Sequence, residues 1–391
     1  MAPDTRSASG DLVRRHRLPE PVHVTRPTLP PLDAYREKLE QTWRSGWLTN
    51  DGDLQRELES RLTGYLGIDH LSLCCNGTVA LLIALQACGV EGGEVITTPF
   101  TFPATPHALH WNRVRPVFCD IEEHWFNLDP ERLEACIGPD TRAILPVHVF
   151  GHPCDVEALQ SVADRHGIPI IYDAAHAMGV SRRGRSILAW GTASVLSFHA
   201  TKLFTTGEGG AVVSHSSEER ETIRSFRNFG IADEETVVGP GINGKLSELH
   251  AALGLLQLDR IDAEIAHRRR LTGIYRERLR DVPGIAFRED QPEVSYNYAY
   301  FTILVDPRAY GMDRDALHAR LQEFNVYTRK YFHPLCSHYP PYTSLPSARP
   351  ENLPVAERIA ARVLCLPLYG TLAPETVEEI CAILAAVRGT G

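Results

Sequence analysis

Short apolar runs alternate with amphipathic stretches through the N-terminal part of the chain. Residues spaced three and four apart predict helices at 54–66, 79–88, 130–136 and 155–166. Apolar runs bounded by turn residues predict strands at 71–73, 94–98, 114–120, 143–147 and 168–172. This alternation of strand and helix is typical of an α/β fold, in which helices cover both faces of a mostly parallel sheet.

The stretch at 194–214, SVLSFHATKLFTTGEGGAVVS, has a different pattern. One apolar run ends at Phe198, a loop that carries Lys202 follows, and a glycine-rich turn at 207–210 leads to a second apolar run. The pattern predicts strand, exposed loop, tight turn and strand. A lysine at the mouth of two buried strands would be partly desolvated, which lowers its pKa and favours the nucleophilic neutral amine. A solvated lysine in a hairpin loop is the alternative.

The pattern changes after residue 260. An amphipathic helix is predicted at 247–260 and an arginine-rich helix at 262–279. Further strands are predicted at 299–305 and 326–327, and further helices at 314–323, 356–363 and 374–387. We therefore expect a large α/β domain at 24–260 and a small C-terminal α+β domain at 261–391. Residues 1–23 have no apolar core, and we expect a flexible lead-in there rather than a secretory signal.

Composition narrows the functional class. The 391 residues carry a net charge of −9, with 43% hydrophobic and 23% charged residues, as in ordinary globular proteins. This charge argues against nonspecific binding to nucleic acid or anionic membranes, and no apolar run approaches the length of a membrane span. The nine cysteines show no C-x-x-C spacing. We therefore expect reduced thiols and a cytoplasmic location rather than a disulfide framework.

The histidines do not predict a metal site. His148 and His152 are four residues apart, which is the spacing of a helical ligand pair. Pro146, Gly151 and Pro153 oppose a continuous helix at that place, so the pair cannot present both rings on one helical face.

Three features could carry chemistry. Gly77 and Thr78 lie where a strand meets a helix, which offers backbone N–H groups, a hydroxyl and the positive helix end to a phosphate; an ordinary N-cap by Thr78 is the alternative. Asp173 follows the strand at 168–172, at the edge where open α/β sheets bind ligands, although it could also cap the next helix. Lys202 is one of only four lysines, and arginine stays protonated and cannot replace it as a nucleophile.

Together these features match the needs of pyridoxal 5′-phosphate. That cofactor requires a phosphate anchor, an acid beside its pyridine nitrogen and a lysine that bonds to its aldehyde. A carboxylate raises the pKa of the ring nitrogen and keeps it protonated, so that the ring can accept electrons from a carbanion. Phe102, in the segment TPFTFPAT, is available to stack on the ring.

Several motifs extend this interpretation. YDAAHA, SFHATK followed by GEGG, NGT-x-AL and GINGKLSELHAALGL together resemble the DegT/DnrJ/StrS family of pyridoxal-phosphate-dependent sugar aminotransferases. The resemblance covers nearly the whole chain from about Val24. It implies an aspartate-aminotransferase-type fold with a large and a small domain, working as a homodimer with shared active sites. Members of the family that act as dehydratases have histidine in place of the lysine, so Lys202 favours transamination.

The resemblance also implies a role for each matching residue. Lys202 would bond to the cofactor, and Asp173 would pair with the ring nitrogen. His176 would lie at the ring-oxygen side, and Phe102 would stack on the ring. The cofactor phosphate would be bound by Gly77, Thr78, Ser197 and, from the neighbouring subunit, Asn243.

The stretches VTRPTLPPLDAY, LTNDG and LPVHVFGHPCDVEAL are most similar to viosamine-type enzymes of this family. Those enzymes aminate dTDP-4-keto-6-deoxy-D-glucose at C4, with L-glutamate as the expected amino donor. Cationic groups should line the pocket of a sugar that carries a diphosphate. A C3 aminotransferase, a sugar dehydratase and a non-enzymatic regulator on the same fold are the alternatives. The charged candidates for substrate binding could equally be solvated surface groups. The candidate substrate-binding residues are Arg227, Arg329, Lys330, Tyr331 and His333.

Overall fold

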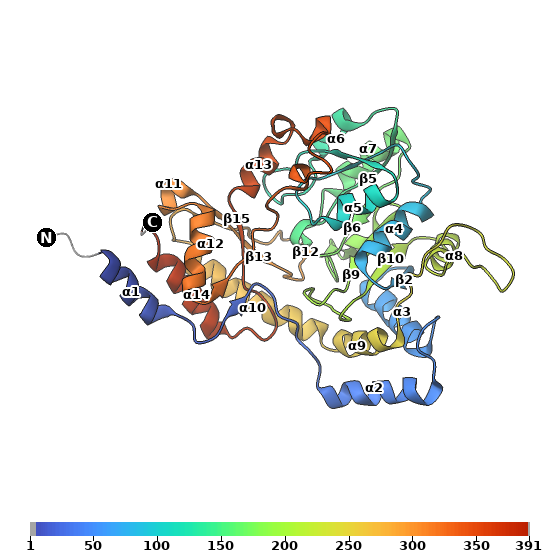
Figure 1. The fold of residues 1–391 in the computed structure, drawn as a ribbon, viewed down its shortest axis with the longest axis horizontal. Helices are drawn as coiled ribbons and strands as arrows, with labels where there is room; N and C mark the ends of the chain where they lie inside the picture. Colours follow the sequence, from blue (N-terminus) through green and yellow to red (C-terminus); the bar gives the residue numbers. More distant parts are fainter. Residues whose placement is uncertain (1–4, 390–391) are drawn as a thin grey trace.

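The computed structural model describes residues 5–389. The large domain is built on two sheet segments that lie edge to edge (Figure 1). Parallel bridges from Ile144 to Ile170 and from Val147 to Asp173 join the segments. The first segment has the order β2 (His70–Cys74), β10 (Gly210–Ser214), β9 (Ala193–Ser197) and β6 (Ile171–Asp173); the second has the order β4 (Arg115–Phe118), β3 (Glu94–Thr97) and β5 (Thr141–Leu145).

Strand β10 is antiparallel to β2 and β9, and the other strand pairs of this sheet are parallel. Successive side chains face opposite sides of a strand, so Val195 and Leu196 belong to two different apolar cores. The predicted α/β fold, with a mostly parallel sheet between helices, is therefore confirmed. The covering helices are α3 (Asp53–Leu66), α4 (Gly77–Ala87), α5 (Ala104–Trp111), α6 (Pro130–Cys136), α7 (Val156–His166), α8 (Ser217–Phe226) and α9 (Glu248–Leu258).

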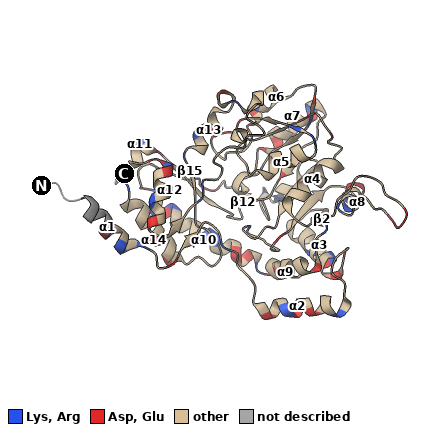
Figure 2. Ribbon diagram, viewed as in Figure 1, with Lys and Arg blue, Asp and Glu red and all other residues tan. Residues whose placement is uncertain are grey.

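Helix α2 (Leu32–Ser45) lies outside α9, away from the sheet (Figure 1). Tyr35 Oη donates a hydrogen bond to Leu249 O at 3.0 Å and fixes the helix against α9. Basic and acidic residues are interspersed along α2, which gives this helix a solvated outer face (Figure 2). Within residues 5–389, none of the helices combines the length and the apolar character that a membrane crossing requires.

The C-terminal part forms a second, antiparallel sheet with its own apolar core. Phe332 and Leu335 nevertheless pack with Phe100 and Phe118 of the large domain, so apolar packing continues across the domain boundary predicted at residue 261. The elements of this part are α10 (Ile261–Leu279), β11 (Ile285–Ala286), β12 (Val294–Ser295), β13 (Phe301–Val305), α11 (Pro307–Tyr310), α12 (Arg314–Glu323), β14 (Val326–Tyr327), α13 (Pro354–Ala360), β15 (Val363–Leu366) and α14 (Pro374–Ala386). Strand β12 joins a small separate sheet with β7 (Ser181–Arg182) and β8 (Arg185–Ser186).

The N-terminal segment differs from the flexible lead-in that we expected at residues 1–23, of which 1–4 lie outside the described residues. Helix α1 covers Thr5–His16, and β1 (Val22–His23) pairs in parallel with β14. Leu18 and Val22 are buried in the core of the C-terminal part, and Asn325 Nδ2 donates to Leu18 O at 2.7 Å. These apolar residues are too few to form a core of their own, but they cover one that another part of the chain provides.

The loop at 46–52 is held over the start of α9. The carboxylate of Glu248 is buried and accepts bonds from Leu54 N at 2.9 Å and from Gln55 N at 2.8 Å. Gly52 occupies the N-cap position of α3 and has no side chain to cap it, so Glu248 satisfies first-turn N–H groups and puts a negative charge at the positive helix end. A Cβ on Gly52 would collide with the Glu248 carboxyl carbon, so a larger residue there would push this side chain away from the start of α3.

We expect Glu248→Ala to lower the free energy of unfolding by about 1–3 kcal/mol, because it leaves two N–H groups of α3 without a partner. Urea unfolding followed by circular dichroism measures the change. Glu57→Ala is the matched control, since Glu57 lies on the exposed face of α3, and it should change the same quantity by less than about 0.5 kcal/mol. Equal effects of the two substitutions would contradict the capping role of Glu248.

Candidate active site

A cavity of about 540 Å³ opens beside the carboxyl ends of β6 and β9 and the N-terminus of α4. Its size and position suit a cofactor together with part of a substrate. The structure brings together in this cavity every cofactor-binding residue that was predicted within one subunit: Gly77, Thr78, Phe102, Asp173, His176, Ser197 and Lys202.

Asp173 is the last residue of β6, and its side chain is buried. Thr105 Oγ1 donates to Asp173 Oδ2 at 2.7 Å, and Ala175 N donates to Oδ1 at 3.1 Å. Burial raises the pKa of Asp173, whereas these two hydrogen bonds and the positive charge of Lys202 lower it. The carboxylate is thus oriented by neutral donors and needs a cation in the cavity to balance its charge.

Lys202 enters the same cavity from the loop between β9 and β10. The base of this loop is closed, because Phe198 N donates to Gly209 O at 2.8 Å and Thr206 N donates to Phe198 O at 3.0 Å. Burial lowers the pKa of Lys202 to about 8, although the charge of Asp173 acts in the opposite direction. A large share of neutral amine is therefore present slightly above neutral pH, which a fully solvated lysine would not provide.

The start of α4 forms a seat for a phosphate. Asn76 is the N-cap, and its side chain accepts from Val79 N at 2.8 Å, so Thr78 is free of the capping role that was the alternative for it. Ser197, at the end of β9, packs closely on Gly77, where an added Cβ would lie 2.9 Å from Ser197 Cβ. First-turn N–H groups, the Ser197 hydroxyl and the positive end of α4 thus face one point.

Two side chains are placed to contact the ring of a planar ligand in the cavity. Phe102 is 56% exposed although it lines the cavity, which leaves its aromatic face open to a planar ligand. The buried ring of His176 accepts a bond from Phe150 N at its Nδ1, at 3.1 Å. Burial and the charge of Lys202 lower the pKa of His176 well below its ordinary value. The neutral ring therefore carries its proton on Nε2, which can only donate.

Some residues of the site, in the cavity lining or behind it, were not predicted. The ring of Tyr300 lies 4.9 Å from that of His176, and the ring of Phe332 lies parallel to the His176 ring at 6.2 Å. Both come from the C-terminal part of the chain, as does the predicted Tyr331. Thr105 was missed as well, although it is in the TPFTFPAT segment that supplied Phe102. Local signals existed for Thr105, as a hydroxyl three residues from Phe102, and for Phe332, which lies between the predicted Tyr331 and His333.

The predicted substrate contact of Arg227 needs correction. Its side chain is 1% exposed, and its guanidinium forms ion pairs with Asp51 and Glu59. The Nζ of Lys330 is likewise paired, with Asp315 Oδ1 at 2.6 Å. The other predicted residues that lie outside the cavity lining are exposed: Arg329, His333 and Asn243.

The residues around the cavity fit pyridoxal phosphate. A phosphate seat, a buried carboxylate, a lysine of lowered pKa and an open aromatic face all border one space. The fold and the site therefore define a pyridoxal-phosphate-dependent enzyme of the aspartate-aminotransferase type.

The chain belongs to the DegT/DnrJ/EryC1/StrS aminotransferase family, which it matches over residues 33–385. It is 44% identical over 366 residues to a dTDP-4-amino-4,6-dideoxy-D-glucose transaminase of Escherichia coli, covering 93% of this chain and 98% of that protein. A transaminase of the same name from Shigella dysenteriae is 41% identical over 371 residues, covering 95% of this chain and all of that one. The predicted family is thus confirmed.

A solved structure agrees with these matches. The crystal structure of DesI in the presence of its TDP-sugar product superimposes with a TM-score of 0.91, at 38% identity, and covers 96% of this chain and 94% of that one. The predicted fold class and cofactor are thereby also confirmed, and the protein is a pyridoxal-phosphate-dependent sugar aminotransferase.

We expect the amine of Lys202 in cofactor-free protein to react with trinitrobenzenesulfonate with a pH midpoint of about 8, because burial lowers its pKa. Mass spectrometry of the labelled peptides follows each of the four lysines separately. Asp173→Asn should move the midpoint lower still, since the Asp173 charge raises the Lys202 pKa. Lys38, on α2, is the internal control for access of the reagent to a lysine outside the cavity. A midpoint for Lys202 near 10.4, the ordinary value for lysine, would contradict a desolvated amine.

Proposed function

We propose that this protein transfers the amino group of L-glutamate to dTDP-4-keto-6-deoxy-D-glucose and so forms dTDP-4-amino-4,6-dideoxy-D-glucose. The observation that carries the proposal is the 44% identity, over 93% of the chain, to a transaminase named for that product. The cavity supports it, because an acid and a lysine border the same space as a phosphate seat.

Lys202 is the proton-transferring residue of the proposed reaction. When bound, pyridoxal phosphate supplies an aldehyde that holds the amine and a ring that accepts electrons from the broken C–H bond. Lys202 Nζ removes the proton from the α-carbon of glutamate, because a pKa of about 8 leaves it partly neutral. The positive charge of the resulting Lys202 ammonium group is balanced by Asp173. This ammonium group can then return its proton to a different carbon atom on the same face of the bound cofactor.

The other cavity residues bind and orient. Asp173 would hold a negative charge at the ring nitrogen, and Thr105 Oγ1 and Ala175 N keep its two oxygens in place. When the cofactor is bound, His176 Nε2–H would donate toward the ring oxygen, and Phe102 would cover the ring face. Because both substrates use this one cavity, glutamate and the keto sugar must enter in turn, which implies ping-pong kinetics. For the sugar diphosphate, Tyr331 inside the cavity and the exposed Arg329 are the proposed contacts.

We also propose a homodimer with shared active sites, located in the cytoplasm. The loop after α8 projects from the large domain (Figure 1), and its Phe229 and Val237 are 50% and 67% exposed. Trp47, on the loop at 46–52, is 55% exposed. Exposed apolar side chains of this size support an interface, through which Asn243 would reach the phosphate of the neighbouring subunit. Nine free cysteines support a reducing compartment.

Incubation of the purified protein with L-glutamate and a panel of dTDP- and UDP-linked keto sugars tests the substrate. We expect one product, in which the 4-keto group of dTDP-4-keto-6-deoxy-D-glucose has become an amine, as identified by mass spectrometry and NMR. A C3-aminated sugar or a dehydrated one as the main product would refute the proposed substrate. Strictly sequential initial-rate patterns would refute the order of the two half-reactions.

Lys202→Ala should abolish steady-state transamination, because no other amine borders the cavity to move the proton. The substitution should also remove the cofactor label that borohydride fixes on the Lys202 peptide of the wild-type protein. Lys38→Ala is the matched control and should change neither readout, since Lys38 is an α2 residue paired with Glu57. Sustained turnover by the Lys202→Ala protein would overturn the assignment.

A further inference from the structure

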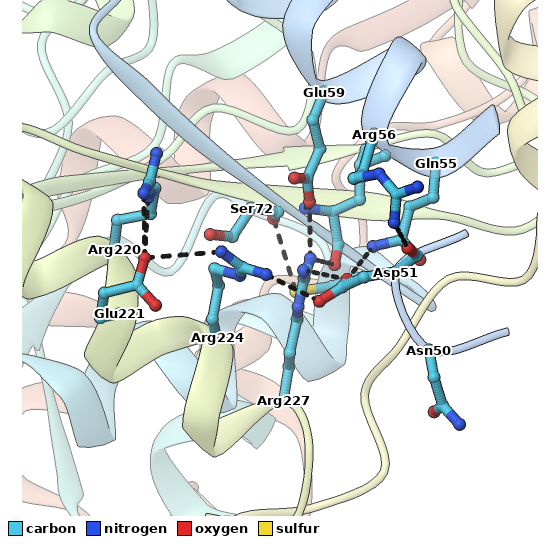
Figure 3. A network of polar contacts seen from close by, with 12 residues as sticks. Asn50, Asp51, Gln55, Arg56, Glu59, Ser72, Arg220, Glu221, Arg224 and Arg227 are labelled. Atoms are coloured by element: carbon cyan, nitrogen blue, oxygen red, sulfur yellow. Dashed lines mark hydrogen bonds and ion pairs between the residues drawn. The ribbon is translucent and has the colours of Figure 1, made fainter. Parts of the chain in front are cut away.

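Arg227 stands where α8 ends and the long projecting loop begins. Its Nη1 donates to Glu59 Oε1 at 2.7 Å and to Leu73 O at 2.6 Å, and its Nη2 donates to Asp51 Oδ1 at 2.6 Å (Figure 3). One buried guanidinium thus ties together helix α3, strand β2 and the loop at 46–52.

The backbone of Arg227 holds the returning end of the same projecting loop. Gly244 N donates to Arg227 O at 2.8 Å, and Gly244 O accepts from Cys75 N at 2.7 Å. An antiparallel bridge pairs Asn243 with Asn228 across the base of the loop. Asn243 is therefore fixed directly beside this anchor, while its own side chain is exposed and does not line the cavity of its own chain.

Asp51 connects this anchor to a second arginine. Arg224 Nη2 donates to Asp51 Oδ2 at 2.9 Å, and Gln55 Nε2 donates to Oδ1 at 2.7 Å. Burial raises the pKa of Asp51, but the charges of Arg227 and Arg224 and the hydrogen bonds from Arg224 and Gln55 outweigh this effect and hold the pKa below its ordinary value. Asp51 stays ionised at neutral pH. The carboxylates of Asp51 and Glu59 therefore face the guanidinium groups of the two arginines in a partly buried network (Figure 3).

We infer that Arg227 and Asp51 are positioning residues for the active site of the neighbouring subunit, through the loop that carries Asn243. This inference rests on the shared-site homodimer proposed above. Removal of the guanidinium leaves Asp51, Glu59 and Leu73 O without their common donor, so the base of the loop must shift. The shift displaces Asn243 from the partner's phosphate seat, and the partner's Lys202 then acts on a poorly held cofactor.

Mixed dimers, purified through two different tags, separate an effect on the partner from an effect on the same chain. One chain carries Lys202→Ala, so it can contribute only its intact loop to an active site. The other chain carries Asn243→Ala, so it can contribute only its intact lysine. One of the two sites is then complete, so the dimer should show about half of the wild-type activity. After dialysis it should retain about one tightly held pyridoxal phosphate.

Arg227→Met is then added to one chain at a time. On the loop-supplying chain it should lower the activity of the mixed dimer by about tenfold or more and remove the retained cofactor. On the lysine-supplying chain it should leave both readouts near their starting values. Asp51→Asn, a milder change at a partly exposed residue, should give the same asymmetry and serves if Arg227→Met chains do not fold.

Two results overturn the inference and can be told apart. If the mixture of Lys202→Ala and Asn243→Ala chains is no more active than its parents, the shared site itself is refuted. If that mixture is active but Arg227→Met and Asp51→Asn act equally in either chain, or more strongly in the lysine-supplying chain, the proposed function stands and only the positioning role falls. A stronger effect in the lysine-supplying chain would place the role of Arg227 in its own chain, through β2 and the phosphate seat at Gly77.

Discussion

The opposite charges of the buried Asp173 and the partly buried Lys202, which border one cavity, are the constraint on which the site depends. Either charge alone would be costly to bury, and each shifts the pKa of the other toward its charged form. The sheet brings them together because β6 and β9 are parallel neighbours, with Asp173 in register with Val195. The lysine loop then leaves β9 directly beside the aspartate, and β10 returns antiparallel to close its base.

Close backbone approaches keep the phosphate seat next to this pair. A Cβ on Gly210 would lie 2.6 Å from the carbonyl carbon of Asn76, and one on Gly77 would lie 2.9 Å from Ser197 Cβ. Strand β10 can therefore pass the start of α4 at a distance that only glycine allows. The seat, the lysine loop and the end of β9 form one packed unit, which explains why a short segment of the chain provides several of the proposed cofactor-binding residues.

A second set of charges organises the periphery. Arginine provides most of the positive charge of this chain, and at Arg227 its several donors serve a carbonyl oxygen and two carboxylates at once, which the compact ammonium of a lysine could not do with the same geometry. Glu248 has the corresponding role for the start of α3. Both residues hold loops that carry exposed apolar side chains, so the polar networks lie behind the surface that the proposed dimer would use.

Local patterns were sufficient for much of this picture. The strands of the large-domain sheet and most of the helices follow from apolar periodicity, because periodicity reports which side chains face a core. Lys202 and Asp173 could be found because each follows a buried strand, and the ends of parallel strands share one edge. The resemblance to a family then added His176, Ser197 and Asn243.

Packing between distant segments settled the rest. Tyr300 and Phe332 enter the cavity from the C-terminal part, and α1 and β1 attach to a core formed by much later residues. Arg227 was expected at a substrate but pairs with Asp51, which lies 176 residues earlier. Local sequence patterns do not encode these contacts. The folded core must first bring the two ends of a long intervening segment together, and only then is it decided which distant groups meet.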